Sequence, residues 1–221
     1  HAIRVEDVQE FVHWLAARPN GRGASLSSSS QRKYLNSLSN LFRRAISERV
    51  VPLGHNPAAA LLEKPQEGRG RKEAKWLEVP DAALLLAATL KQKSAERSST
   101  ISPVQLHAIV ATMLLTGGRP SEVLGLEIRD VSFSRKTVCF RPNAIRTRLK
   151  TLQSERVVPL WPQLHGILEE YVGTLAKKSG PLFPSPQTGR TIRDVRKAID
   201  RAAAELGWAK GAVRPYSLRH S

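Results

Sequence analysis

The apolar positions near the start of the chain recur every three or four residues, as they do along one face of a helix. This spacing predicts a first helix over residues 5–17. A second apolar stripe predicts a helix that runs to about Arg49 from the serines at 27–30, which can cap its N-terminus. A shorter helix is expected over residues 58–62. We therefore predict a small helical domain over residues 1–65.

Residues 66–75 interrupt this pattern. They are rich in Gly, Arg, Lys and Glu and show no apolar periodicity. A stretch of this composition buries little surface and is typical of an exposed linker. We therefore expect a second, larger domain over residues 76–221.

The larger domain continues with helical patterns. The run over 104–116 is strongly apolar, so this helix is expected in the core. Gly117 and Gly118 interrupt the run, and Pro120 suits the first turn of the next short helix, because its fixed φ and missing N–H fit that position. A last helix is expected to be capped by Ser217. Further helices are predicted over residues 80–90, 162–178 and 191–206.

Between the short helix that begins at Pro120 and the helix predicted over residues 162–178, the apolar period changes to two, which is typical of strands. Three short strands are predicted, over residues 129–133, 137–141 and 155–160. A tight turn joins the first two, and a longer basic loop over 142–154 joins the last two. The expected fold class is therefore mainly α with a small antiparallel β-sheet.

Charge narrows the choice of partner. The 221 residues include 35 Lys and Arg against 19 Asp and Glu, a formal net charge of +16. Such an excess favours a polyanion, because neutralising phosphates releases their condensed counterions. The plainer alternative is a basic protein whose charge only keeps it in solution.

Composition disfavours several other classes. Cys139 is the only cysteine, so an intrachain disulfide is impossible, and we expect it to be a small buried strand residue rather than a reactive thiol. No histidine pair has the spacing of a zinc helix, so no metal site is expected. No apolar run approaches the roughly 20 residues that span a bilayer, so no membrane partner is expected.

Two arginines stand in unlike contexts. Arg119 lies in Leu-Leu-Thr-Gly-Gly-Arg-Pro-Ser-Glu-Val-Leu-Gly-Leu, and Arg219 lies in Tyr-Ser-Leu-Arg-His. A guanidinium is permanently charged and can donate two parallel hydrogen bonds to phosphate oxygens, so such a pair suits charge neutralisation at a phosphodiester. Taken alone, Arg119 could equally be a helix-start residue that pairs with Glu122, three positions later on the same helical face.

These two segments resemble the phosphate-binding boxes of the tyrosine recombinases, the phage integrase family. A third segment, Lys150-Thr151 followed at 156–160 by Arg-Val-Val-Pro-Leu, resembles the lysine-bearing β-hairpin of that family. The resemblance covers most of the chain. It implies a helical core-binding domain over 1–65, incomplete here, and a mixed α+β catalytic domain over 76–221. The activity it implies is site-specific DNA recombination or integration through a 3′-phosphotyrosine intermediate.

The resemblance also implies roles for single residues. Arg119 and Arg219 would hold the scissile phosphate, and Lys150 would protonate the leaving 5′ oxygen. The alternative for Lys150 is one more solvated lysine in a basic loop. Glu122 would support the active-site network, and His220 is expected to pack under Arg219 as a hydrogen-bonding group.

Tyr216 departs from the family pattern, because most members carry a histidine at that position. A phenol with a pKa of about 10 cannot serve as an ordinary base near neutral pH. We therefore expect Tyr216 to contact the phosphate without a strict acid–base role. It precedes Arg219, whereas the nucleophilic tyrosine of the family follows that arginine, so Tyr216 is not expected to be the nucleophile.

Contacts with the DNA backbone are expected from two pairs of arginines. Arg146 and Arg148 lie in the basic loop, and Arg43 and Arg44 lie on the polar face of the second helix. The implied partner is double-stranded DNA, with a homotetramer at synapsis, a cytoplasmic location, and neither a metal nor another cofactor.

The sequence ends two residues after Arg219, before any counterpart of the nucleophile. We therefore expect these 221 residues to hold a phosphate but not to cut it. Three alternatives remain: a binding module of the same fold without cleavage activity, a related telomere resolvase or type IB topoisomerase, and an unrelated basic helical DNA-binding protein. The lysine-bearing hairpin argues against the last of these.

Overall fold

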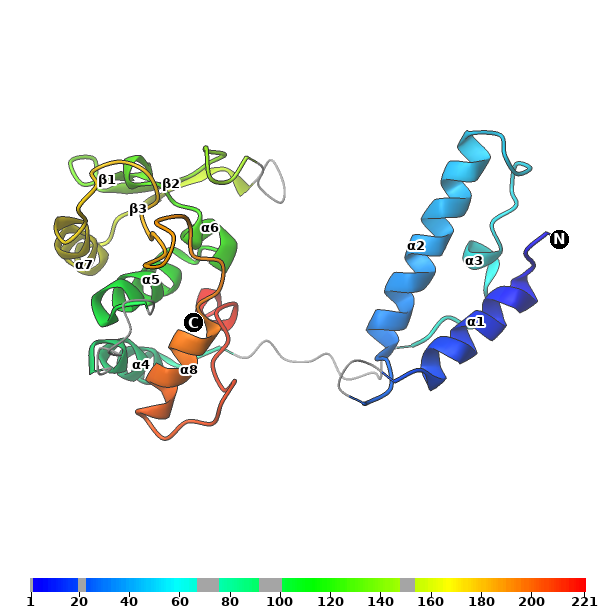
Figure 1. Ribbon diagram of the computed structural model, residues 1–221, viewed down its shortest axis with the longest axis horizontal. Coiled ribbons are helices and arrows are strands. Elements are labelled where there is room, and N and C mark those ends of the chain that lie inside the picture. The colour runs from blue at the N-terminus through cyan, green and yellow to red at the C-terminus, as the bar shows by residue number, and fades with distance from the viewer. Residues whose placement is uncertain (1, 20–22, 67–75, 92–100, 148–153) are drawn as a thin grey trace. The chain divides into compact units, whose positions relative to one another are not determined.

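The computed structural model describes residues 2–19, 23–66, 76–91, 101–147 and 154–221. The chain divides into two compact units, His1–Lys72 and Glu73–Ser221 (Figure 1). Each unit has its own hydrophobic core. The assignment of these units as core-binding and catalytic domains stays a prediction.

The described part of the smaller unit contains three helices around one core. The first has the bounds that the apolar pattern predicts. Ser27 caps the second, because its Oγ accepts a hydrogen bond from the backbone N–H of Ser30 at 3.3 Å. Asn56 ties the third helix to the second by donating to the carbonyl of Ser39 at 3.1 Å. The helices are α1 (Val5–Ala17), α2 (Ser28–Ser47) and α3 (Pro57–Ala60), and the core consists of Val8, Val12, Leu35, Phe42, Ala58 and Leu61.

The larger unit is built on α5, Pro103–Thr116, whose residues between Gln105 and Met113 are nearly all buried, as the apolar run predicts. Two helices pack directly on α5, and a third packs against one of these two. A short helix follows α5 in the chain, and a single 3-10 turn near residue 219 also packs on α5. Both predicted phosphate-binding segments therefore rest on this helix. The elements are α4 (Val79–Lys91) and α7 (Pro162–Gly173) on α5, α8 (Arg196–Ala204) on α4, then α6 (Pro120–Leu124) and the 3-10 turn Ser217–Arg219.

The sheet of the larger unit has three antiparallel strands in the order β1-β2-β3. β2 pairs through Val138 with Val131 of β1 and through Cys139 with Val157 of β3. Val138 and Phe140 point into the core, as the alternation along a strand requires. The predicted class, mainly α with a small antiparallel sheet, is confirmed. The strands are β1 (Val131–Ser132), β2 (Thr137–Phe140) and β3 (Arg156–Pro159).

Two helix predictions were too long. α7 ends at Gly173 rather than near residue 178. α8 begins at Arg196 rather than at Thr191, because Thr191 is paired with Pro184 in an antiparallel bridge and is therefore extended. The segment between residue 191 and α8 is consequently a loop, which becomes important for the site.

Two single-residue predictions in this unit were wrong. Cys139 is only half-buried, because Val138 and Phe140 take the inward positions of β2. Ser217 does not cap a helix. It is the first residue of the 3-10 turn, and its hydroxyl donates back to the carbonyl of Arg214 at 2.7 Å.

Candidate functional site

The turn that carries Arg119 depends on the two glycines before it. Gly117 ends α5 with φ +59°, a left-handed conformation that favours glycine. Gly118 is closely covered, because a Cβ there would lie 2.7 Å from Cγ2 of Val123 and 2.9 Å from Cζ of Phe140. Arg119 follows as the N-cap residue of α6, and its side chain is 26% exposed. The glycines thus bring a partly exposed guanidinium to the end of a buried helix.

Glu122 binds two arginines at once. Its Oε1 accepts from Nη1 of Arg119 at 2.6 Å, and its Oε2 accepts from the Arg119 backbone N–H at 3.0 Å and from Nη2 of Arg156 at 3.0 Å. The side chain of Glu122 is only 3% exposed. Burial alone would raise the pKa of this carboxyl, but the hydrogen bonds from Arg119 and Arg156 outweigh that effect and hold its pKa below the ordinary value. Glu122 is therefore ionised and fixes the orientation of Arg119.

Ser154 links Arg119 to the loop between β2 and β3. Nη1 of Arg119 also donates to Oγ of Ser154 at 3.0 Å. Ser154 directly follows residues 148–153, so Arg148 and Lys150 lie outside the described residues and their placement stays a prediction. The geometry joins Arg119 to the end of the segment that carries Lys150.

Arg156, at the start of β3, is a residue whose importance the sequence analysis missed. Its Nη2 pairs with Glu122, its Nη1 donates to the carbonyl of Ser154 at 3.0 Å, and its guanidinium carbon lies 4.3 Å from the centre of the Phe140 ring. The basic residue was visible in the sequence, but two of its partners, Glu122 and Phe140, come from distant segments. Arg156 therefore belongs to the same network as Arg119 and Glu122.

Arg146 donates hydrogen bonds to carbonyls of the protein itself. Its Nη1 donates to the carbonyl of Glu122 at 2.6 Å, and its Nη2 donates to the carbonyl of Arg141 at 3.0 Å. Burial lowers the pKa of this guanidinium. Both Nη atoms are thus directed at carbonyls within the protein, and the expected contact of Arg146 with the DNA backbone stays a prediction.

Arg219 lies on the 3-10 turn beside the end of α5. A Cβ added to Gly117 would lie 3.9 Å from the carbonyl oxygen of Arg219, so the two segments are neighbours. The Arg219 side chain is half-buried, and its Nη1 is buried with no hydrogen-bond partner among the described residues. Buried polar atoms are nearly always paired, so this atom is suited to a ligand that accepts hydrogen bonds.

Tyr216 and His220 lie on the surface of the same turn. Tyr216 is 55% exposed, and His220 is also exposed. Their rings meet edge to face, with centroids 5.2 Å apart. The His220 ring therefore contacts Tyr216, and its expected packing under Arg219 stays a prediction.

The smaller unit carries the other predicted pair. Arg43 and Arg44 are exposed on α2, and Arg44 forms an ion pair with Glu48 at 2.8 Å. An exposed pair of this kind contributes little to stability. Both arginines are thus accessible from solvent, and their proposed contact with DNA stays a prediction.

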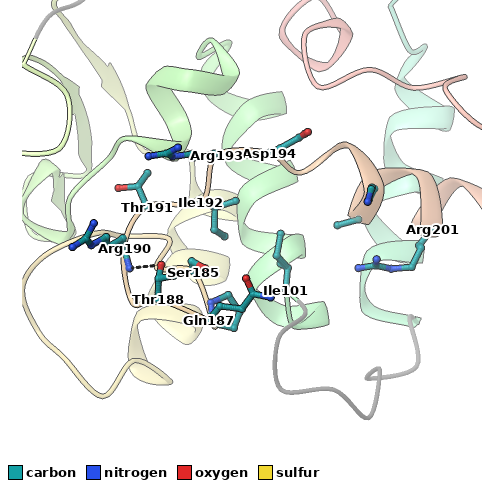
Figure 2. Close-up of a pocket in the computed structure, with 13 residues that line it drawn as sticks. Ile101, Ser185, Gln187, Thr188, Arg190, Thr191, Ile192, Arg193, Asp194 and Arg201 are labelled. Carbon is teal, nitrogen blue, oxygen red and sulfur yellow. Dashed lines mark hydrogen bonds between the residues drawn. The ribbon is translucent and has the colours of Figure 1, made fainter. Parts of the chain in front are cut away.

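A basic pocket of about 470 Å³ lies where the extended segment before α8 meets the start of that helix (Figure 2). Its single acid, Asp194, is bound by Arg196, whose Nη2 donates at 2.6 Å, and this hydrogen bond lowers the pKa of Asp194. The four basic side chains therefore lack a free acidic counterpart in the lining. This pocket was not predicted from the sequence, although the basic residues at 193, 197 and 201, four positions apart, could have indicated one basic face of a helix. The basic lining residues are Arg190, Arg193, Lys197 and Arg201.

Neither a membrane-spanning helix nor a metal-ligand cluster is found among the described residues. None of their helices is long and apolar enough to cross a membrane. Within the same ranges, no three His, Cys, Asp or Glu side chains are grouped so that they could hold a metal ion. The charged groups that gather near Arg119 are instead guanidinium groups and one carboxylate.

The class of protein follows from comparison with known families. The sequence model of the phage integrase family matches residues 75–221, which is well over half of the chain. The chain belongs to the phage integrase family. The matched region includes every residue of the Arg119 network and of the Arg219 turn.

Individual relatives are the XerD tyrosine recombinases. The chain is 25% identical over 199 residues to XerD of Brucella suis, covering 87% of this chain and 61% of that protein. It is 28% identical over 222 residues to XerD of Mycobacterium leprae, covering 97% of this chain and 66% of that protein. The chain therefore spans somewhat less than two thirds of the length of these relatives.

Solved structures agree on the fold. The integrase of the Tn1549 transposon, in complex with transposon right end DNA, aligns with a TM-score of 0.69 at 17% identity, covering 99% of this chain and 71% of that chain. The XerH site-specific recombinase bound to its difH substrate aligns with a TM-score of 0.65 at 18% identity, covering 99% of this chain and 58% of that chain. Identities this low carry the fold alone.

Proposed function

We propose that this chain supplies the phosphate-binding part of a strand transferase for site-specific recombination, which cleaves and rejoins DNA through a 3′-phosphotyrosine. The observation that carries the proposal is the meeting of Arg119 and Arg219 at one end of α5. Arg119 is oriented by Glu122, and Arg219 keeps a buried Nη1 without a hydrogen-bond partner in the described residues. Two guanidinium groups of this kind suit the oxygens of one phosphate. Membership of the family supports the same reading.

The proposed reaction needs few groups. A tyrosine hydroxyl attacks the scissile phosphorus, the bond to the 5′ oxygen breaks, and the tyrosine proton passes to solvent. Arg119 and Arg219 neutralise the non-bridging oxygens of the transition state. Lys150 gives a proton to the leaving 5′ oxygen. The 5′ hydroxyl of a partner strand then attacks the phosphotyrosine and reverses these steps, so neither a metal nor a nucleotide is consumed.

The three tyrosines of the chain do not suit the attacking role. Tyr171 is buried, its hydroxyl donates to the carbonyl of Leu182 at 3.0 Å, and burial raises its pKa to about 12. Tyr34 belongs to the smaller unit, and Tyr216 precedes Arg219 in the 3-10 turn segment. We propose that Tyr216 contacts the phosphate, and that a polypeptide of these 221 residues holds a phosphate without cutting it.

Duplex DNA is the proposed partner, and the net charge of +16 supports it. We propose that the smaller unit, as a core-binding domain, contacts the backbone through Arg43 and Arg44. In the catalytic domain, Arg148 and the basic pocket before α8 would add phosphate contacts. A homotetramer at synapsis and a cytoplasmic, DNA-associated location belong to the same proposal.

The experiment that tests this function is covalent trapping of the full-length protein on a nicked suicide duplex. Arg119→Ala and Arg219→Ala are each expected to slow trapping by about 100- to 1000-fold, as the loss of a transition-state donor does. Arg135→Ala is the matched control, because Arg135 is an exposed arginine on the turn between β1 and β2. Wild-type trapping by either site variant would contradict the proposal. Binding without any trapping by the unaltered protein would favour a non-cleaving DNA-binding module.

A further inference from the structure

The carboxylate of Glu122 is divided between two arginines. Its Oε1 accepts from Nη1 of Arg119 at 2.6 Å, and its Oε2 accepts from Nη2 of Arg156 at 3.0 Å. Among the described residues, no other carboxylate forms an ion pair with either arginine. One negative charge is therefore set against two positive charges, which leaves the three side chains with a net charge of +1.

Arg156 is held by the sheet as well as by Glu122. It lies opposite Phe140 in the pairing of β2 with β3, and its guanidinium carbon lies 4.3 Å from the centre of the Phe140 ring. The quadrupole of an aromatic ring attracts a cation in this position. Nη1 of Arg156 also donates to the Ser154 carbonyl at 3.0 Å. The positive charge of Arg156 is thus fixed beside Glu122 by contacts that do not involve Arg119.

Arg119 uses a single atom of its guanidinium for its contacts within the protein. Nη1 donates both to Glu122 and to the Ser154 hydroxyl. Among the residues that the structure describes, no acceptor is bound to its Nε or Nη2, and the side chain is 26% exposed. The remaining donors of Arg119 are therefore available to a phosphate, and their strength depends on how far the charge of the guanidinium is cancelled.

A buried carboxylate beside Arg119 has two opposite effects. It fixes the guanidinium, but its negative charge opposes the approach of a phosphate. The side chain of Glu122 is only 3% exposed, so water screens this charge weakly. A second cation on the same carboxylate offsets the repulsion. Arg156 is that cation, whereas the Nη atoms of nearby Arg146 donate to backbone carbonyls.

We infer that Arg156 is a positioning residue for Arg119, which balances the negative charge of Glu122 so that this carboxylate orients Arg119 without cancelling the positive charge offered to the scissile phosphate. The inference rests on the proposed function, because the phosphate concerned is the one that is cleaved. Removing a unit charge about 8 to 10 Å from a reacting phosphate changes the rate by about 10- to 30-fold, at the screening typical of a protein surface.

The test compares covalent trapping of the full-length protein on two nicked suicide duplexes. One carries the ordinary scissile phosphate, and the other carries a methylphosphonate, in which a neutral methyl group replaces a charged oxygen. The ratio of the two trapping rates, phosphate over methylphosphonate, cancels any loss that affects both substrates equally. This ratio is expected to fall by about 10- to 30-fold in Arg156→Met and to stay within about threefold of the wild-type value in Arg156→Lys, which keeps the charge. Arg135→Met is the matched control, because Arg135 is exposed, and it should leave the ratio unchanged.

Three outcomes would overturn the inference. The first is equal slowing of Arg156→Met on both substrates, which would assign Arg156 to stability or orientation alone. The second is unchanged trapping on both substrates. The third is a ratio that falls as far in Arg156→Lys as in Arg156→Met, because the charge would then not be what matters.

A folding defect in Arg156→Met would not remove the test. If this variant shows no thermal unfolding transition, the comparison is made in the Glu122→Gln background, where no carboxylate is left unpaired. The double variant Arg156→Met/Glu122→Gln is then expected to have a ratio about 10- to 30-fold below that of Glu122→Gln, because the same unit charge is lost. Equal ratios in these two variants would contradict the inference.

Arg119→Ala separates this inference from the function on which it rests. If the unaltered protein is trapped on the ordinary duplex, Arg119→Ala is strongly slowed, and the ratio does not respond to Arg156→Met, the proposed function stands and the role of Arg156 fails. If the unaltered protein is not trapped at all, the proposed function itself fails, and the role of Arg156 fails with it.

Discussion

The turn that carries Arg119 and the turn that carries Arg219 lie at the same end of α5, yet they hold their guanidinium groups in different ways. Arg119 is bound by the carboxylate of Glu122 and by the hydroxyl of Ser154. Arg219 sits in a single 3-10 turn, and its buried Nη1 has no partner in the described part of the chain. The ion pair with Glu122 orients Arg119 but partly neutralises its charge. The Nη1 of Arg219 has no partner among the described residues and can therefore donate to a ligand.

The two turns thus represent two ways in which a protein can position an arginine for a phosphate. An arginine fixed by an acid is preorganised, which avoids reorganisation during the reaction but weakens the field at the phosphate. An unpaired guanidinium gives a stronger field and depends on packing for its position. Rescue by added guanidinium should distinguish the two turns, substitutions at Glu122 and Gly118 should test how the Arg119 turn is held, and Lys197→Ala concerns the basic pocket.

The largest effect is expected from chemical rescue of the two alanine variants, each of which should be slowed by about 100- to 1000-fold in covalent trapping. Added guanidinium is expected to restore Arg119→Ala by about tenfold, because the Glu122 carboxylate attracts the cation at the vacated position. The same addition should leave Arg219→Ala nearly unchanged, since Arg219 has no acidic partner among the described residues. Equal rescue of both variants would contradict the proposed difference in how the two arginines are paired.

The next largest effect is expected from Glu122→Gln, measured by urea unfolding. Removing the acid leaves Arg119 and Arg156 beside a neutral amide, and breaking a buried ion pair from one side costs about 3 kcal/mol. Glu170→Gln is the control, because Glu170 is exposed on α7, and it should change stability by less than about 0.5 kcal/mol.

The Glu122 difference should also depend on pH. The pKa of Glu122 is lowered in the folded protein, so the unfolded chain binds its proton more readily. The stability that Glu122 contributes is therefore complete well above the unfolded value of about 4.3 and is lost as the pH falls toward the lowered folded value. Urea unfolding at pH 7 and near pH 4 should show the gap between wild type and Glu122→Gln shrinking at the lower pH. A gap that widens on acidification would contradict the assigned ionisation.

A smaller effect on stability is expected from Gly118→Ala. The new methyl group would press on Val123 and Phe140, and overpacking of this kind costs about 1–3 kcal/mol. Gly166→Ala is the control, because a Cβ there meets nothing within 4 Å and the position lies within α7. The control should be neutral or stabilising by up to about 1 kcal/mol, because alanine favours a helix over glycine. Equal effects of the two variants would show that the Arg119 turn is not tightly packed.

The smallest effect is expected outside both turns, from Lys197→Ala in the basic pocket. If this lysine contacts a DNA phosphate, its loss should reduce the slope of log K against log salt by about 0.9. Fluorescence anisotropy on a duplex at several salt concentrations measures this slope. Lys177→Ala is the control, since Lys177 is exposed and lies outside the pocket. An unchanged slope for Lys197→Ala would remove the pocket from the proposed interface.

Much of the fold could be predicted from the sequence, because local patterns determine it. The bounds of α1 follow from one apolar stripe, and α5 follows from its continuous apolar run. The end of α7 was missed because Leu175 continues the apolar spacing beyond the helix, where it still packs on the core. The start of α8 was missed because it depends on a bridge between Thr191 and Pro184, which no local pattern reveals.

The candidate site was less predictable than the fold. Motifs indicated Arg119 and Arg219, but they could not tell which guanidinium is paired. Arg146 was assigned to DNA because it lies in a basic loop, whereas its guanidinium donates to the nearby carbonyl of Arg141 and to that of Glu122, 24 residues away. Arg156 was missed for the same reason, since Glu122 is 34 residues away. Contacts over such distances are set by tertiary packing, so single-sequence reasoning finds the charged residues but not their direction.

The end of α5 serves as the common origin from which both arginines are placed. Arg119 follows it through Gly117 and Gly118, and the backbone of Arg219 lies against Gly117. A core substitution that shifts or tilts α5 slightly would therefore alter the separation of the two guanidinium groups without changing either. Random mutagenesis restricted to the buried face of this helix should yield stable variants with graded rates. The spacing of the proposed phosphate clamp would then be an adjustable parameter for engineering recombinases, controlled from the hydrophobic core.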